Sequence, residues 1–491
     1  MTMNKVLAAG TVIGTAISLY GAEAEKPNIV FILCDDLGIG DIGVYGQQKL
    51  KTPNIDSLAM TGMKFTNHYS GSTVCAPSRC SLMTGLHMGH AFIRGNNPKG
   101  QGIPPHNIGQ CPIPEDSVTI PKILKKAGYT TGMFGKWGLG GPNNTGSSSK
   151  QGFDEFFGYY CQGHAHTYYP KYLWHNSEKV ELDGNTYSHD LIWNKGMEFI
   201  RKEAKAGKPF FAYMAVTVPH AAMSAPPALH EKWRKIYPQF DKVIGRYGGK
   251  NCGKDKQVIN PIAGFAAMME NLDNQVGGLI GELKKLGIYD NTIIIFTSDN
   301  GAHREGGHQP SFWDSNGHYR GLKRDLYEGG IITPMLVSWP AKIKPESVTG
   351  ELSAFWDWLP TFAEIAGVKL PENYKTDGVS LVPTLTGDPE KQEHHKYLYW
   401  EFTERGPKKA IRSSNWKAVW FYEPDGVTVK KQELYDLSKD IGEQDNVADK
   451  YPEKMQELEK MRDNAHSDSP FFQFRGNIKN KEKKKKTKKK K

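Results

Sequence analysis

The sequence predicts an α/β protein with a large mixed, mostly parallel sheet between layers of helices, followed by a smaller C-terminal α+β subdomain. Continuous apolar runs of strand length occur at three separated places, and segments with apolar residues at helical spacing lie between them. Strands that alternate with helices are typical of a parallel sheet. Beyond about residue 385 the pattern changes to short stretches that favour antiparallel strands.

The three apolar runs have the composition of strands buried on both faces of a sheet. They occupy residues 27–36 (PNIVFILCDD), 208–220 (KPFFAYMAVTVPH) and 291–301 (NTIIIFTSDNG). Each run ends in polar side chains, and open α/β sheets form their sites at the carboxyl ends of such strands. We therefore expect one edge of the sheet to carry Asp35, Asp36, His220, Asp299 and Asn300.

The other elements are predicted from apolar spacing and from the residues that end helices. They are helices over residues 118–129, 266–290 and about 451–462, and short antiparallel strands within residues 395–402, 409–421 and 427–437.

The first residues have the pattern of a secretory signal peptide. Lys5 precedes an apolar stretch, residues 6–20, which is followed by the small residues Ala22 and Ala24. An uncleaved membrane anchor is the alternative, but the stretch is short and contains glycine and threonine. We predict a signal peptide at residues 1–24 and an exported, periplasmic or secreted protein without stable membrane insertion.

The net charge of +10 is concentrated at the other end, where residues 479–491 hold ten lysines and one glutamate. Because the rest of the chain is close to neutral, we expect no nucleic-acid partner. We predict a solvated basic tail over residues 471–491, with binding to an acidic polymer as the alternative. Between the two ends we predict a main domain, residues 25–385, and a C-terminal subdomain, residues 386–470.

Six cysteines are too few to cross-link a fold of 491 residues, and none belongs to a C-x-x-C pair. Export would permit a disulfide between Cys111 and either Cys161 or Cys252. The sequence does not choose between these pairings.

The strand ends CDD and SDN together offer four hard oxygen side chains, from Asp35, Asp36, Asp299 and Asn300. Such ligands favour Ca²⁺, with Mg²⁺ as the second choice, over Zn²⁺, which prefers histidine and cysteine. Taken singly, acids at a strand end are also typical of solvated turns and helix caps. Their occurrence at two strand ends favours a metal site.

Cys75 lies in the stretch GSTVCAPSRCSLMTG, residues 71–85. Pro77 is typical of the first turn of a helix, whose free N–H groups attract anions, and Arg79 adds guanidinium donors nearby. The other common role of a free cysteine is that of a small buried hydrophobic residue.

This stretch resembles the sulfatase signature C-x-P-S-R-x-x-x-x-T-G. The resemblance extends through NIVFILCDDLGIGDIGVYG, TPNIDSLAMTGMKFTNHYS, GKWGLG, TSDNG, GLKRDLYEGGIITPMLVSWP and ELYDLSKD, in family order, and covers roughly residues 26–462. It implies a formylglycine-dependent sulfatase of the alkaline-phosphatase-like fold, and more specifically a carbohydrate sulfatase, with residues 25–385 as the catalytic domain.

The resemblance implies that a maturation enzyme oxidises Cys75 to Cα-formylglycine (3-oxoalanine), with Pro77 and Arg79 in the motif that this enzyme reads. The hydrated aldehyde would then attack the sulfur of a sulfate ester. By the same resemblance, Ca²⁺ would be held by Asp35, Asp36, Asp299, Asn300 and the modified Cys75.

Four further roles follow from the resemblance. Arg79 would orient the nucleophile, Lys136 and Lys323 would neutralise sulfate oxygens, and His220 would protonate the leaving alcohol. Taken alone, each lysine would more commonly be a surface residue.

One position departs from the family pattern. The usual motif is G-K-W-H-L-G, and this chain has Gly138 in place of the histidine that is thought to accept a proton when sulfate is expelled. We predict a substitute base within residues 158–174, with His166 as the first candidate and His164 as the second. Gly138 and the basic tail also leave open a non-catalytic protein that binds sulfated glycans.

Aromatic side chains are frequent in the same segment, where they could line a sugar pocket or fill a core. His303, Arg304 and His308 follow the second acidic strand end and are candidates for contacts with anionic substrate groups, as is His164. We therefore expect a sulfated glycan substrate, either a galactan of carrageenan type or a glycosaminoglycan fragment. Aryl sulfates and phosphodiesters or phosphonates are the alternatives.

Overall fold

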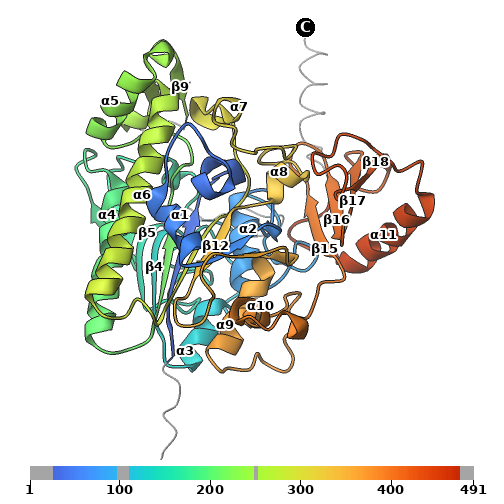
Figure 1. Ribbon diagram of the computed structural model, residues 1–491, viewed down its shortest axis with the longest axis horizontal. Coiled ribbons are helices and arrows are strands. Elements are labelled where there is room, and N and C mark those ends of the chain that lie inside the picture. The colour runs from blue at the N-terminus through green and yellow to red at the C-terminus, as the bar shows by residue number, and fades with distance from the viewer. Residues whose placement is uncertain (1–25, 97–109, 248–252, 476–491) are drawn as a thin grey trace, which may run out of the picture.

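The computed structural model describes residues 26–96, 110–247 and 253–475 (Figure 1). The predicted signal peptide and the lysine run at residues 479–491 lie outside these residues. Within them, no helix has both the length and the apolar character needed to cross a membrane.

The main sheet has ten strands within the described residues, in the order β13-β2-β12-β11-β1-β8-β4-β5-β6-β7. The central block β11-β1-β8-β4-β5 is parallel, whereas β12 and β6 join it antiparallel at its two sides. The strands are β1 Asn28–Cys34, β2 Gly62–Phe65, β4 Thr130–Lys136, β5 Glu155–Tyr159, β6 Tyr172–His175, β7 Glu178–Glu181, β8 Phe210–Ala215, β11 Thr292–Ser298, β12 Met335–Ser338 and β13 Ser347–Thr349.

The three strands predicted from apolar runs, β1, β8 and β11, are neighbours at the centre of this sheet. Ile29 of β1 is paired with Ile293 on one side and with Phe211 on the other. Every residue of the three strands is buried, because helices cover both faces. Their continuous apolar composition follows from this double burial.

Alternate residues of β1 pack into two different cores. Val30 and Ile32 face the layer formed by α1, α4 and α6, whereas Ile29, Phe31 and Leu33 face the layer formed by α2, α3 and α9 (Figure 1). The helices are α1 Pro53–Met60, α2 Cys75–Thr84, α3 Ile120–Lys126, α4 Ser188–Lys205, α5 Pro227–Ile236, α6 Pro261–Lys285, α7 Pro310–Trp313, α8 Glu328–Ile331, α9 Trp358–Ile365, α10 Val382–Thr386 and α11 Pro452–Ala465. Two small strand pairs complete these layers: β3 His68–Tyr69 with β14 Ser353–Ala354, and β9 Ile244–Arg246 with β10 Gln257–Ile259.

The helix predicted over residues 266–290 is α6, which begins earlier and ends earlier than the apolar spacing indicates. Its start is set by Asn260, whose side chain accepts a hydrogen bond from the N–H of Ala263 at 3.0 Å, followed by Pro261 in the first turn.

The C-terminal segment forms a separate four-stranded antiparallel sheet with α11 packed on it (Figure 1). Its strands are β15 Leu398–Phe402, β16 Lys408–Ser413, β17 Trp416–Tyr422 and β18 Val429–Asp436. The predicted stretch 409–421 therefore contains two strands, because the chain turns at Ser414, where φ is +53°. The boundary predicted between residues 385 and 386 falls inside α10 and stays a prediction.

A buried charge network joins this sheet to the main domain. Lys417 of β17 lies between Glu328 of α8 and Glu443, with its Nζ 2.8 and 2.9 Å from their carboxylates, and Arg412 of β16 contacts Glu328 at 3.2 Å. Apolar residues of both parts, such as Tyr69 and Trp400, pack beside this network. The two parts are thus held together by a continuous interior.

The described cysteines Cys34, Cys75, Cys80, Cys111 and Cys161 are free thiols. The pairing of Cys111 with Cys161 is therefore not formed, and Cys252 lies outside the described residues.

Candidate active site

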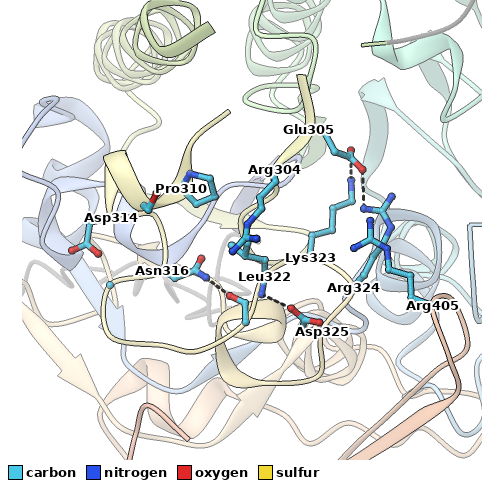
Figure 2. A pocket seen from close by; sticks show the side chains of 13 residues that line it. Arg304, Glu305, Pro310, Asp314, Asn316, Leu322, Lys323, Arg324, Asp325 and Arg405 are labelled. Atoms are coloured by element: carbon cyan, nitrogen blue, oxygen red, sulfur yellow. Dashed lines mark hydrogen bonds and ion pairs between the residues drawn. The ribbon is translucent and has the colours of Figure 1, made fainter. Parts of the chain in front are cut away.

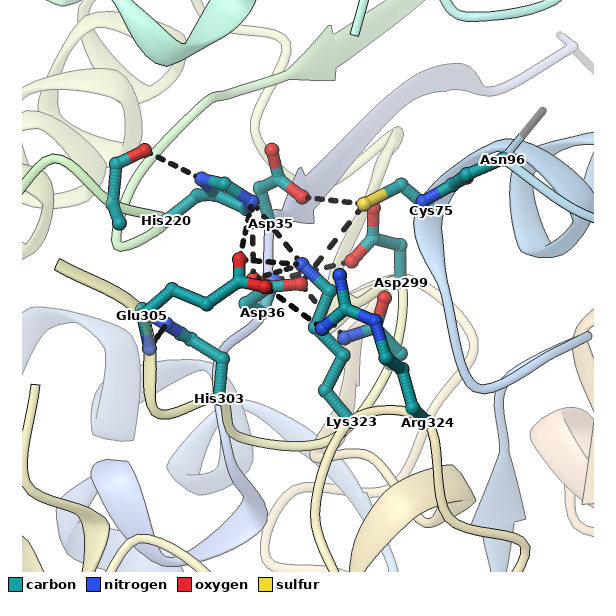
Figure 3. Close-up of polar contacts among 12 residues, drawn as sticks. Asp35, Asp36, Cys75, Asn96, His220, Asp299, His303, Glu305, Lys323 and Arg324 are labelled. Carbon is teal, nitrogen blue, oxygen red and sulfur yellow. Dashed lines mark hydrogen bonds and ion pairs between the residues drawn. The ribbon is translucent and has the colours of Figure 1, made fainter. Parts of the chain in front are cut away.

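The carboxyl ends of β1, β4, β8 and β11 lie at the first turn of α2. Figure 3 shows Asp35, Asp36, His220 and Asp299, which follow three of these strands, near Cys75. Cys75 is the first residue of α2, and its Sγ lies 3.3 Å from Asp35 Oδ1 and 4.0 Å from Asp36 Oδ1. Burial and the neighbouring Asp35 raise the pKa of the Cys75 thiol well above its usual value. An unmodified Cys75 is thus held in the protonated form, which is a weak nucleophile.

Asp36 lies two residues after the end of β1 and has a positive φ of +65°. Its backbone N–H donates to Asp299 Oδ1 at 3.1 Å, and its own Oδ1 accepts from Asn300 Nδ2 at 2.8 Å. The strand ends of β1 and β11 are thereby tied to each other, as expected for neighbouring parallel strands.

These residues fit a hard divalent cation. The ligand atoms of Asp35, Asp36, Cys75 and His220 lie within 4.8 Å of one another, and all four residues are buried. Asn300 Oδ1 is also buried and accepts no hydrogen bond from the described residues, although a carboxamide oxygen is a good ligand for such an ion. Three of these five donors are oxygen atoms, the ligand type that Ca²⁺ and Mg²⁺ prefer.

Arg79 lies one turn into α2 and is 1% exposed. Its Nε and Nη2 donate to Asp299 Oδ2 at 3.0 and 2.7 Å, and its Nη1 donates to the carbonyl of Lys136 at 2.7 Å. The guanidinium group therefore connects α2 with the ends of β4 and β11. A buried arginine with both edges paired is rigidly placed.

Two lysines complete the charged cluster. Lys136 Nζ donates to Asp35 Oδ2 at 2.6 Å, and Lys323 Nζ donates to Asp36 Oδ2 at 2.7 Å. Both side chains are buried, so their role as surface residues is excluded.

His220 follows β8 and receives a hydrogen bond from Lys323. Its Nδ1 lies 2.6 Å from the carbonyl oxygen of Ala221, which can only accept, so Nδ1 carries the proton and Nε2 accepts from Lys323 Nζ at 3.1 Å. Burial and the positive charge of Lys323 lower the pKa of His220 well below its usual value. The imidazole is therefore neutral, with its one proton on Nδ1.

Glu305 also belongs to this cluster and was not predicted from the sequence. Its carboxylate contacts Lys323 Nζ at 3.3 Å and Arg324 Nη1 at 2.7 Å (Figure 3). It also accepts a hydrogen bond from the hydroxyl of Tyr247 at 3.0 Å. Burial raises its pKa, but the cations Lys323 and Arg324 outweigh burial and lower the pKa to about 2. The sequence could have indicated Glu305 only through its position directly after Arg304, which was predicted to contact the substrate.

The two histidines of the aromatic segment have different surroundings. His166 stacks on His220 with ring centroids 4.6 Å apart and an angle of 2° between the planes. His164 packs instead against Tyr159 and Tyr172, at 4.9 and 4.3 Å. The structure thus brings His166 to the cluster and places His164 beside a different group of rings.

His303 and His308 continue the stack on the far side of His220. The ring of His303 lies 5.6 Å from His220, and that of His308 lies 4.9 Å from His303. Both are buried, whereas Arg304 between them is exposed. Their proposed contacts with substrate stay predictions, and Arg304 lies in the wall of a cavity.

That cavity has a volume of about 550 Å³ and opens beside the charged cluster (Figure 2). Lys323 and Glu305 line it together with Arg304, Arg324 and Arg405. A cavity of this size suits one or two sugar rings, and its wall carries more cations than acids.

The fold and this site define a hydrolase for anionic esters, because a potential metal cluster, two lysines and an arginine surround a residue at a helix N-terminus. The chain belongs to the sulfatase family: the family profile "Sulfatase" matches residues 27–368, and "N-sulphoglucosamine sulphohydrolase, C-terminal" matches residues 317–467. It is accordingly a sulfuric ester hydrolase of the alkaline-phosphatase-like fold.

Several proteins of known activity are similar to it. N-acetylgalactosamine-6-sulfatase of Rattus norvegicus is 32% identical over 76% of this chain and 68% of its own length. N-acetylgalactosamine-6-O-sulfatase of Bacteroides thetaiotaomicron is 30% identical over 90% of this chain and 93% of its own. The crystal structure of Ps i-CgsB in complex with k-i-k-neocarrahexaose superposes with a TM-score of 0.72 and 29% identity, covering 89% of this chain and 92% of that one.

Proposed function

We propose that the protein removes sulfate from a sugar of a sulfated glycan, with Cys75 acting after conversion to formylglycine and with Ca²⁺ as the metal. The observation that carries this proposal is the position of Cys75 at the start of α2, with Asp35, Arg79 and Lys136 around it. The raised pKa of the thiol supports it further, because an unmodified cysteine would be a poor nucleophile there.

The metal and the converted residue would supply a polarised hydroxyl nucleophile. Asp35, Asp36, Asp299 and Asn300 would hold the metal, and Arg79 would keep Asp299 oriented through its two hydrogen bonds. Ca²⁺ is preferred to Mg²⁺ because Ca²⁺ accepts more oxygen ligands in a less regular arrangement. A maturation enzyme that reads Pro77 and Arg79 is the implied partner.

Lys136 and Lys323 would bind the sulfate oxygens. Each ammonium group is buried and already fixed by one aspartate, so little reorganisation is needed when an anion arrives.

The leaving alcohol would receive its proton from His220, whose Nε2 faces Lys323. The Nδ1 proton is held by the carbonyl oxygen of Ala221, so Nε2 must first take up a proton from solvent, and it then transfers that proton to the alcohol oxygen as the S–O bond breaks. Glu305 would stabilise the cationic form of His220.

The cavity beside the cluster supports a polyanionic saccharide as the substrate. Arg304 and Arg405 line it, and neither guanidinium forms an ion pair or hydrogen bond within the described part of the chain (Figure 2). Carboxylates and sulfates are the ligands that arginine forks prefer. Relatives named for N-acetylgalactosamine 6-sulfate and a carrageenan oligosaccharide in a related structure support glycosaminoglycan or galactan fragments. With such substrates, export through residues 1–24 is the proposed route.

A panel of defined sulfated saccharides tests the function, with sulfate release measured by ion chromatography. We expect release from a glycosaminoglycan or carrageenan fragment to exceed that from 4-nitrophenyl sulfate, and no release of phosphate from 4-nitrophenyl phosphate. Preference for the aryl ester, or for phosphate, would overturn the glycan assignment.

Conversion of Cys75 is tested separately. Protein made together with a maturation enzyme should contain the aldehyde form of the Cys75 peptide by mass spectrometry, and only that form should turn over. Equal turnover by the fully unmodified thiol protein would show that the mechanism is wrong.

A further inference from the structure

The position that lacks the family's histidine is filled from elsewhere in the chain. A Cβ atom placed on Gly138 would lie 2.0 Å from Nε2 of Gln162, far inside van der Waals contact. The φ of Gly138 is +79°, a conformation that side-chain-bearing residues rarely adopt. The carboxamide of Gln162 therefore occupies the space that a side chain at position 138 would take.

Gln162 is buried without hydrogen bonds. It is 7% exposed, and neither its Nε2 nor its Oε1 has a partner among the residues that the structure describes. Burying both ends of a carboxamide without partners is costly, and folded proteins rarely do so. An amide left in this condition indicates a ligand that pairs with it.

The amide lies between two elements that belong to the site. Gly138 follows Lys136 by two residues, and its N–H donates to the carbonyl of Tyr160 at 3.2 Å, which brings the end of β4 against the segment that contains Gln162. Four residues after Gln162, the chain reaches His166, whose ring stacks on His220.

We propose that Gln162 replaces the side chain missing at Gly138 as a contact to the bound sulfate group. Its Nε2 donates to a sulfate oxygen, which can only accept, and its Oε1 accepts from a hydroxyl group next to the sulfate. A carboxamide does not titrate near neutral pH, so Gln162 binds the anion and leaves proton transfer to the imidazoles. This assignment rests on the proposed sulfatase function.

Binding of inorganic sulfate to the thiol form of the protein tests the contact without turnover. Isothermal titration should give a Kd about 10- to 100-fold weaker for Gln162→Met than for the unsubstituted protein, since a hydrogen bond to a charged group is lost while the volume is kept. Gln162→Glu should weaken sulfate binding at least as much, because it adds a negative charge. Gln48→Met, the same change at an exposed position, should leave the Kd unchanged.

Thermal unfolding tests whether the Gln162 carboxamide occupies the space that a side chain at position 138 would need. Gly138→Ala should lower the Tm by more than Gly128→Ala, because Gly128 has a similar φ of +85° but no atom within 4 Å of its Cβ position. Combining Gly138→Ala with Gln162→Ala should remove this difference.

The outcomes separate the two proposals. If the unsubstituted protein binds no sulfate, the proposed function and this contact both fail. If it binds sulfate and both Gln162 variants bind equally well, only the assignment of Gln162 is overturned. If the Tm changes of Gly138→Ala and Gln162→Ala simply add in the double variant, the carboxamide of Gln162 does not occupy the space beside Gly138.

Discussion

At the scale of single residues, the site is a set of matched charges. Asp35 pairs with Lys136, Asp36 with Lys323, and Asp299 with Arg79, at distances of 2.6 to 2.7 Å. A divalent cation added to this set gives it a positive charge, which favours a sulfate ester over a neutral ligand. The same pairs explain why six ionisable side chains can be buried together.

Replacing Asp299 by alanine tests this arrangement. The variant should lose metal, measured by plasma mass spectrometry, and should lose turnover, because a proposed ligand and the partner of Arg79 are removed together. Arg79, which would lose its two close contacts with a carboxylate while staying buried, should also lower the stability by about 3–5 kcal/mol.

Asp183→Ala, at a fully exposed turn, is the control and should keep both metal and turnover. Stoichiometric metal in Asp299→Ala would remove Asp299 from the ligand set.

At the scale of elements, the short 3-10 helix His164–His166 places its two histidines in different surroundings. A single turn directs His166 onto His220 and His164 into a contact with Tyr172. Burial lowers the pKa of His166 to about 3 and that of His164 to about 4, so both rings are neutral near pH 7. A neutral imidazole can accept a proton, and only His166 is close to the charged cluster.

His166→Ala should therefore slow turnover of a small sulfate ester much more than His164→Ala does. Loss of a positioned base costs ~100- to 10,000-fold in rate. Steady-state kinetics on fully converted enzyme would measure both variants, and circular dichroism would confirm that each is folded. A larger effect of His164→Ala would transfer the role to that residue, and near-normal rates for both would exclude this segment as the source of the base.

At the scale of the whole molecule, the two parts are joined through buried charge. Lys417 is fully buried between Glu328 and Glu443, and no other lysine of the described residues forms an ion pair with either carboxylate. Removing it would leave two carboxylates facing each other in a low-dielectric interior.

Lys417→Met should thus lower the free energy of unfolding by about 3–5 kcal/mol, measured by urea denaturation. Lys439→Met, which breaks an exposed contact with Asp436, should change it by no more than about 0.5 kcal/mol. Equal effects of the two variants would show that the buried network does not hold the parts together.

The lysine-rich end gives a second test at this scale. Truncation after Arg475 removes residues outside the described fold, so turnover of a small sulfate ester should be unchanged. Affinity for a long sulfated polymer, measured by retention on a heparin column, should fall if the tail binds polyanions. Loss of small-substrate turnover on truncation would mean that the tail is part of the catalytic unit.

Local sequence determined the strands, their polar ends and the motif around Cys75. Continuous apolar runs such as residues 29–34 are typical of a sheet covered on both faces, and parallel strands bring Asp35 and Asp299 to the same edge. These features depend on composition and period, which are visible along the chain.

Tertiary structure alone decided which distant side chains meet. Three contacts join segments whose approach depends on packing. They are the stacking of His166 on His220, the ion pair of Lys323 with Glu305 and the contact of Gln162 with Gly138. Neighbouring residues on one short turn, such as His164 and His166, have the same local signals and opposite surroundings. Period and propensity describe how a segment folds, whereas the contacts of its side chains depend on which other segments fill the space beside it.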